Sequence, residues 1–161
     1  MKRCGAILRS VFVGPEFLIV IAGAALLVFF PNPFIWLSER IGNQAELLKY
    51  FGLLPAGLVV YDATVAKNIL LPDGDKQQIF QSWELHWEFK CAVVVGLVYS
   101  FCFAIAGIVA LLFDWQTPEA HQSALLATSV AGGLMVSVTL FFAHIRIEEL
   151  FRQHSVKPSA E

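Results

Sequence analysis

The feature that most constrains this chain is residues 91–113, CAVVVGLVYSFCFAIAGIVALLF, an apolar run without a single charged side chain. A helix of this length can cross the ~30 Å of hydrocarbon in a bilayer, because each residue adds ~1.5 Å. Residues 16–37 and 123–143 form two further apolar runs of similar length. The chain is 57% hydrophobic and only 15% charged, which is more apolar than soluble domains are. The sequence therefore predicts a helical membrane protein.

A fourth segment, residues 47–71, decides the topology of everything after it. It is apolar over residues 51–61 and then carries Asp62 and Lys67 before it becomes apolar again. Pro55 lies inside it and predicts a kink or break. If this segment crosses the membrane, the chain has four spans.

The distribution of basic residues indicates that this segment does cross. With four spans, both ends of the chain and residues 62–90 face the same side of the membrane. Only Arg40 and Lys49 then lie on the other side. The positive-inside rule places the side richer in Lys and Arg in the cytoplasm. Nine of the eleven basic residues are on that side: Lys2, Arg3, Arg9, Lys67, Lys76, Lys90, Arg146, Arg152 and Lys157.

We therefore expect an all-α, polytopic integral membrane four-helix bundle, in one domain over residues 1–161, with both termini in the cytoplasm of a bacterial cell. The basic N-terminus resembles that of a signal peptide, but PNPFIWL follows where a small-residue cleavage site would stand, which favours a retained anchor in the inner membrane. Pro31 and Pro33 are expected to break the first helix near its far end. The predicted spans are about residues 16–37, 47–71, 91–113 and 123–143.

Two extensions are predicted on the cytosolic side. Residues 77–90 have apolar and polar side chains at helical spacing, which predicts an amphipathic helix at the membrane interface before the third span. Residues 144–154 are expected to continue the last span into the cytosol. Exposed aromatic residues are typical of partner docking, and Trp is equally typical of the membrane interface, so both interpretations stay open. The candidate docking residues for a soluble cytosolic protein are Phe80, Trp83, Trp87, Glu148, Glu149 and Arg152.

The last span carries a stripe of small and hydroxylated residues. Small residues let helix backbones approach closely in a membrane, so this stripe is expected to contact another helix rather than lipid. The contact could lie within the bundle or between copies, and a symmetric homo-oligomer is expected. The stripe consists of Ala124, Thr128, Ala131 and Gly132.

Asp62 and Lys67 are the candidate functional charges. In one interpretation, Asp62 lies near the middle of the span as a pore-lining or proton-accepting acid, with Lys67 as its counter-charge. In the other, the hydrocarbon ends near Tyr61, so that Asp62 caps the helix at the headgroups and Lys67 snorkels to the surface. Their spacing of five residues is poor for an ion pair within one helix, which favours the second interpretation slightly.

The sequence offers no enzymatic or metal-binding motif. Nucleophile-elbow, phosphate-loop and dinucleotide patterns are absent. His144 and Glu148 are one helical turn apart and could supply two metal ligands, whereas a site needs three or four. The net charge of −2 gives no basic surface for nucleic acid. We expect no cofactor, no metal and no direct nucleic-acid partner.

Residues 40–46, RIGNQAE, resemble the Arg/Asn/Glu signature of the small four-helix membrane enzymes that metabolise glutathione and eicosanoids. Arg40, Asn43 and Glu46 occupy the corresponding places. The spacing from arginine to asparagine is one residue shorter than in that family. The family also binds its thiol cofactor from the cytosolic face, while this segment is predicted outside. We therefore expect a non-enzymatic protein.

In the layout of its spans, the whole chain resembles the small four-span membrane subunit of bacterial anti-phage systems such as Kiwa, which work with a soluble effector. No residue motif carries this resemblance. It implies phage sensing or membrane perturbation. The leading hypothesis is an oligomeric membrane subunit that couples the membrane to a soluble cytosolic partner. The alternative is an oligomeric ion channel or small transporter with Asp62 and Lys67 along its path.

Overall fold

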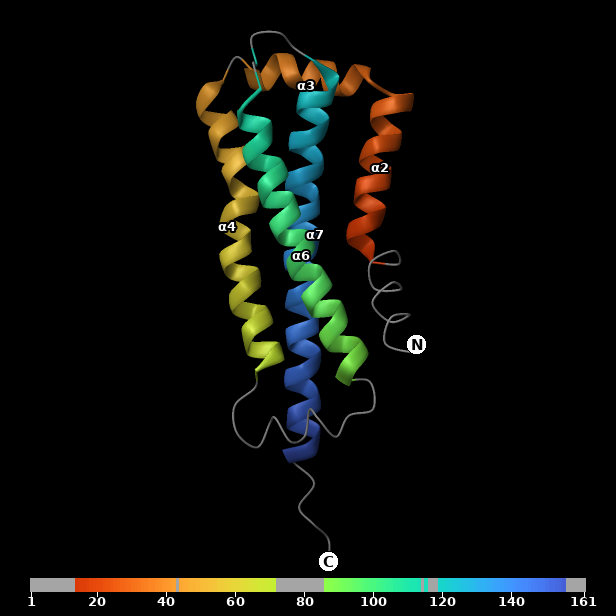
Figure 1. Ribbon diagram of the computed structural model, residues 1–161, viewed down its shortest axis with the longest axis vertical. Helices are drawn as coiled ribbons and strands as arrows, with labels where there is room; N and C mark the ends of the chain where they lie inside the picture. Colours follow the sequence, from red (N-terminus) through yellow and green to blue (C-terminus); the bar gives the residue numbers. More distant parts are fainter. Residues whose placement is uncertain (1–13, 43, 72–85, 114, 116–118, 156–161) are drawn as a thin grey trace, which may run out of the picture.

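The computed structural model of the chain describes residues 14–42, 44–71, 86–113, 115 and 119–155, and helices are the only regular elements in these ranges. The helices run along the long axis of the molecule except α3 (Asn32–Gly42), which lies across one end (Figure 1). The five helices are α2 (Pro15–Phe29), α3 (Asn32–Gly42), α4 (Ala45–Leu70), α6 (His86–Leu111) and α7 (Ala120–Ser155).

The first apolar run, residues 16–37, forms two helices instead of one. α2 ends at Phe29, and α3 begins at Asn32 at an angle of 99° to α2. Pro31 stops α2 because proline has no N–H group to continue the helical ladder. Pro33 falls in the first turn of α3, where that N–H group is not needed. The two prolines therefore turn the chain and send α3 across the end of the bundle.

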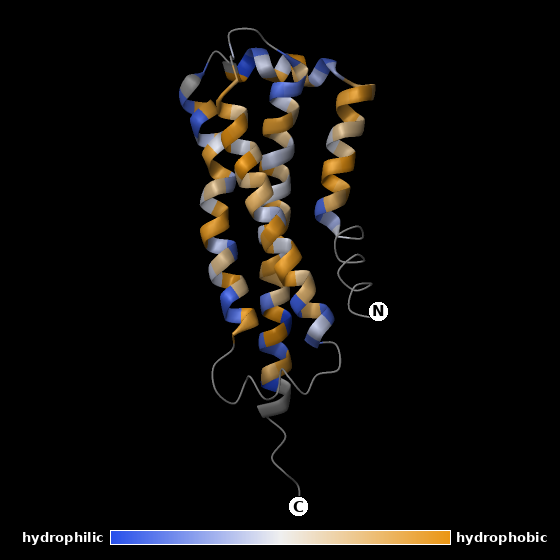
Figure 2. Ribbon diagram, viewed as in Figure 1, coloured by the Kyte–Doolittle hydropathy of each residue, from blue (hydrophilic) through white to orange (hydrophobic). Residues whose placement is uncertain are grey.

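Three helices of the described residues, α4, α6 and α7, are long and apolar enough to cross a membrane. The bent α2–α3 pair makes a fourth only if it counts as one span. Hydrophobic residues predominate along the lengths of the helices, while hydrophilic residues gather at the lower end and around α3 (Figure 2). The prediction of an all-α fold with helices able to span a membrane is thus confirmed.

The centre of the bundle is a three-helix unit in which α4, α6 and α7 all contact one another, while α2 packs chiefly against α7. Its largest apolar cluster joins the lower parts of these three helices. Ile69 and Val136 are completely buried in it. The other buried members are Val65, Ala66, Val93, Phe103, Leu140, Ile147 and Phe151.

α4 runs without interruption through Pro55, where the sequence predicts a kink or break. Pro55 is buried between glycines of the two neighbouring helices. A Cβ atom added to Gly107 of α6 would lie 3.3 Å from the Pro55 ring and 2.7 Å from the backbone oxygen of Gly52. A Cβ atom added to Gly133 of α7 would lie 3.4 Å from Pro55. The glycines make room for the proline, so α4, α6 and α7 pack closely here.

Candidate functional site

Asp62 lies at the centre of the three-helix unit and is completely buried. Ser100 of α6 donates a hydrogen bond from Oγ to Oδ2 of Asp62, over 2.5 Å. Ser137 of α7 donates one from Oγ to Oδ1, over 2.7 Å. The carboxylate therefore joins α4 to both α6 and α7, and we call these three residues the aspartate lock.

Helical geometry explains why Asp62 points inward. Val65, Ala66 and Ile69 follow it at intervals of three, four and seven residues, and all three are buried on the same face of α4. The helix continues for about two turns beyond Asp62, to Leu70, so Asp62 does not end the helix as one interpretation of the sequence expected.

Lys67 lies on a different face of α4 and is exposed. Five residues correspond to a rotation of about 140° around a helix, so Lys67 points away from Asp62. The structure thus brings Asp62 together with two serines and not with Lys67. The two charges do not face a common path within one chain.

The two serines donate hydrogen bonds to the carboxylate oxygens of Asp62, which is completely buried and therefore out of reach of bulk water. A buried polar group that lacks a hydrogen bond is costly, and more so when it is charged. Ser137 also lies 3.2 Å from the backbone oxygen of Gly133, one turn earlier, so its hydroxyl can serve either acceptor. Interhelical hydrogen bonds of this kind contribute about 0.6 kcal/mol each, and up to about 1.7 kcal/mol, in a membrane. The aspartate lock therefore fixes the rotation and register of the three helices more than it adds to their stability.

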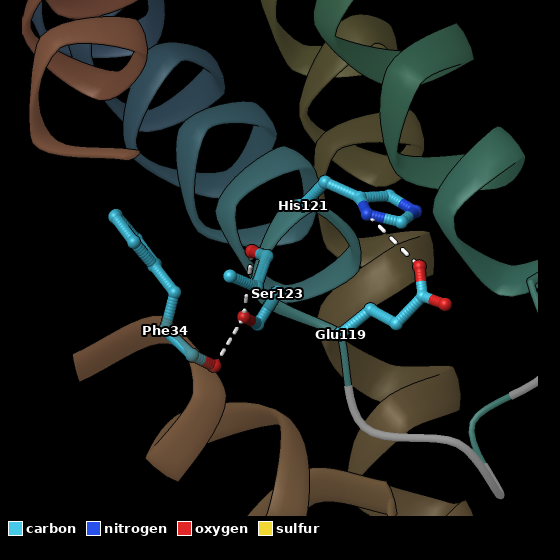
Figure 3. A network of polar contacts seen from close by, with 5 residues as sticks. Phe34, Glu119, His121 and Ser123 are labelled. Carbon is cyan, nitrogen blue, oxygen red and sulfur yellow. Dashed lines mark hydrogen bonds and ion pairs between the residues drawn. The ribbon is translucent and has the colours of Figure 1, made fainter. Parts of the chain in front are cut away.

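A second polar contact fixes α3 to the upper end of α7. Ser123 Oγ lies 2.5 Å from the backbone oxygen of Phe34 in α3 and 3.2 Å from that of Ala120, as Figure 3 shows. His121 turns to the other side of α7, where its Nδ1 atom lies 3.0 Å from Glu119. Ser38, one turn along α3 from Phe34, is completely buried. The crossing helix is thus held on the bundle by polar as well as apolar contacts.

The predicted docking residues lie at the lower end of the bundle where the structure describes them. Trp87, near the start of α6, is 41% exposed. Phe80 and Trp83 lie outside the described residues. On α7, Ile147 and Phe151 are buried in the apolar cluster, so they support the bundle and are not part of the outer surface. The exposed residues of this part of α7 are Arg146, Glu148, Glu149 and Arg152.

The small-residue stripe of α7 meets several neighbours within the chain. Ala124 is buried, Thr128 contacts Gly23 of α2, and Gly132 contacts the ring of Phe103 in α6. Ala131 is exposed and lines an apolar hollow below α3. Three of the four residues therefore pack inside one chain, and one faces outward.

The candidate metal ligands stay a pair. His144 Nε2 lies 3.8 Å from Glu148 Oε1, and in the part of the chain that the structure describes no group of three ligating side chains comes together. Of the RIGNQAE segment, Arg40 lies over the ring of Trp36 at 5.5 Å, Glu46 is exposed, and Asn43 lies outside the described residues.

Ser100, Ser137 and Glu16 are not among the residues predicted from the sequence. Each serine is a hydroxyl within an otherwise apolar run, and such a residue commonly bonds to another helix, which is the signal that could have found them. Glu16, in the first turn of α2, is also buried, and it is close enough to Tyr99 of α6 to interact with it electrostatically. A second acid thus enters the bundle from α2.

Within its described residues the chain is an all-helical protein, and a buried carboxylate joins its three membrane-span candidates to one another. No protein family, curated protein or solved structure matches it in comparisons of sequence and structure.

Proposed function

We propose that this protein is a non-enzymatic membrane subunit that transmits a change in the membrane to a soluble partner in the cytosol. The observation that supports this most is α7, one continuous helix of 36 residues. A helix of this length rises about 54 Å, well beyond the ~30 Å of hydrocarbon. One element therefore spans the bundle and extends past it.

α7 contacts other helices at three levels along its length. Ser123 contacts α3 near the upper end, and Ser137 belongs to the aspartate lock in the middle. Ile147 and Phe151 pack into the apolar cluster near the lower end. A rotation or shift of α7 would have to change all three contacts together, and tightly packed elements of this kind switch between discrete arrangements more readily than they bend.

The exposed side of α7 beyond the lock supplies the surface for a partner. Glu148, Glu149 and Arg152 are charged and exposed, and the opposite side of the same turns is buried against the bundle. Trp87 at the start of α6 adds an aromatic side chain at the same end. Such a surface suits a soluble protein of complementary charge, because charge at the edge of an interface sets orientation and specificity.

Reversing charge on α7 is expected to abolish partner binding without unfolding the bundle. In the Glu148→Lys/Glu149→Lys variant, retention of the partner that co-purifies with the wild type should fall by at least about tenfold, because like charges facing each other cost several kcal/mol. Affinity purification of the full chain from its host, followed by quantitative mass spectrometry, measures this. Truncation at Ile145 is a poor test, because it also removes Ile147 and Phe151 from the apolar cluster.

The matched control for the charge reversal is Glu46→Lys, which changes an exposed acid in the first turn of α4 at the opposite end of the bundle. It should retain the partner at the wild-type level. Equal retention by all three proteins would contradict a partner surface on α7.

The proposed orientation places the end of α7 in the cytoplasm and α3 outside. It is supported by the bias of Lys and Arg toward the lower end, where Lys67, Lys90, Arg146 and Arg152 are found, against Arg40 and Lys49 near α3.

Cysteine labelling tests this orientation. In a variant without Cys4, Cys91 and Cys102, an impermeant maleimide should label Arg40→Cys on intact spheroplasts and label Glu149→Cys only after the membrane is opened. The reverse pattern would place the end of α7 outside the cytoplasm. It would therefore contradict the proposal that this end binds a cytosolic partner.

Homo-oligomerisation, four spans with both termini in the cytoplasm and a role in anti-phage defence belong to the same proposal and rest on the sequence arguments alone.

The alternative function is an oligomeric ion channel or small transporter. It is favoured by the presence of a completely buried carboxylate within a span candidate, because ionisable groups in membranes are costly and are commonly functional. Its path would have to involve Asp62 without Lys67, which lies on another face of α4.

A further inference from the structure

An apolar groove of about 390 Å³ lies below α3, and we call it the α3 groove. Five residues of α7 line it, among them Ala127 and Ala131, together with Leu37 and Ile41 of α3 and Phe51 of α4. Its volume falls in the range of about 300–1,000 Å³ that is typical of small-molecule sites. Every lining side chain is a hydrocarbon, so the groove suits an apolar ligand and offers water no hydrogen bonds.

The groove follows the axis of the bundle. Its α7 lining extends from Leu126 to Leu134, a rise of about 12 Å along the helix. If α7 crosses the membrane, this direction is that of the lipid acyl chains. Ala127 and Ala131 create the hollow, because their methyl groups leave space that a larger side chain on the same face would fill.

α3 carries a cation next to a residue that lines the groove. Trp36 and Arg40 are one helical turn apart on α3, and they directly precede the lining residues Leu37 and Ile41. Arg40 is exposed, and its guanidinium carbon lies 5.5 Å from the centre of the Trp36 ring. α3 lies across the end of the long helices (Figure 1). If those helices cross the membrane, Trp36 and Arg40 would lie at the level of the lipid headgroups, where tryptophan is typical.

We propose that the α3 groove binds one acyl chain of an anionic phospholipid, with its phosphate held by Arg40. The groove supplies hydrocarbon contact along the chain, and the arginine supplies the positive charge where the headgroup begins. A guanidinium group binds a phosphate oxygen well, since both are charged and can form two parallel hydrogen bonds. A second copy of this chain is the competing occupant, and it would leave the exposed Arg40, next to the lining residue Ile41, without a role. This inference does not depend on the proposed coupling function, although it supplies a membrane component that the coupling subunit could sense.

Native mass spectrometry of the full chain tests the proposal. The protein in detergent is titrated with dioleoyl phosphatidylglycerol or with dioleoyl phosphatidylcholine, and lipid-bound and oligomeric masses are counted. The wild type should bind phosphatidylglycerol in preference, with one tight site. Ala131→Phe should weaken binding of both lipids about tenfold, because the ring displaces about two methylene groups of the chain. Arg40→Gln should weaken phosphatidylglycerol about fivefold and leave phosphatidylcholine unchanged, because only the charge is lost.

The matched control is Val138→Phe, which enlarges an exposed side chain of α7 one turn beyond the groove and should bind both lipids as the wild type does. Equal lipid binding by the wild type and Ala131→Phe would overturn the proposal, as would an unchanged phosphatidylglycerol preference in Arg40→Gln. Loss of dimeric mass in Ala131→Phe, with lipid binding unaltered, would assign the groove to a second copy of the chain instead.

Discussion

Replacing Gly107 with alanine is expected to destabilise the protein by about 1–3 kcal/mol, the usual cost of adding volume to a well-packed interior. The added Cβ atom would lie 2.7 Å from the backbone oxygen of Gly52, which cannot turn aside as the end of a side chain can. α4 and α6 would have to separate, and the contacts of Pro55 with both neighbours would loosen. The loss should appear as a lower midpoint of thermal unfolding in detergent.

Two other glycines make this a graded series. Gly133→Ala adds a Cβ atom at an ordinary contact distance of 3.4 Å from Pro55, so a small effect is expected. Gly57→Ala adds one with nothing within 4 Å, and it should leave stability unchanged or raise it by up to about 1 kcal/mol, since alanine is the better helix former. An equal effect at Gly107 and Gly57 would show that α4 and α6 are not packed as described.

Removing the carboxylate of the aspartate lock is the second large change. Asp62→Leu should cost about 1–3 kcal/mol, because Ser100 then keeps a buried hydroxyl whose acceptor has gone. Asp62→Asn should cost less, because its amide can accept a hydrogen bond from one serine and donate one to the other. Unfolding in detergent, followed by circular dichroism, compares the two variants.

The control for that comparison removes all three polar groups at once. Asp62→Leu/Ser100→Ala/Ser137→Ala should recover most of the stability lost in Asp62→Leu alone, because no buried partner is left unsatisfied. If the triple variant is stable and also keeps its cytosolic partner, the aspartate lock is not required for coupling. If it is no more stable than Asp62→Leu, the contacts to the two serines do not explain the effect.

The Asp62→Asn variant also separates the coupling subunit from the channel. In liposomes, the coupling proposal predicts no ion flux through either the wild type or Asp62→Asn. Flux through the wild type that is lost in Asp62→Asn would support the channel or transporter instead, provided the variant folds to the same stability.

How far the sequence predicted the fold depended on the element. The run at residues 91–113 predicted a spanning helix, and α6 (His86–Leu111) contains nearly all of it. The prolines at 31 and 33 predicted a break, but not that α3 would turn by 99° and lie across the bundle. Pro55 predicted a kink or break, and α4 continues through it without a break, while glycines in α6 and α7 leave room for the proline. A proline signals lost hydrogen bonding along its own helix, and its final geometry depends on the neighbouring helices.

The candidate site was predicted only in part. Asp62 was identified because a charge among apolar residues is costly, whereas Lys67, the counter-charge in one interpretation, lies on a different face of α4. Ser100 and Ser137 were overlooked because 38 and 75 residues separate them from Asp62. The packing of α4 against α6 and α7 is what brings them together.

The sequence by itself determined that this chain is helical and suited to a membrane, because long uncharged runs must satisfy their backbone hydrogen bonds internally in hydrocarbon. It could not determine which side of each helix faces inward, because a helix that is apolar all round has no stripe to set its rotation. The tertiary structure decided that rotation. It turned Asp62 toward two serines and Lys67 away, placed Gly107 against a backbone and Gly57 in open space, and left Ala131 beside a groove.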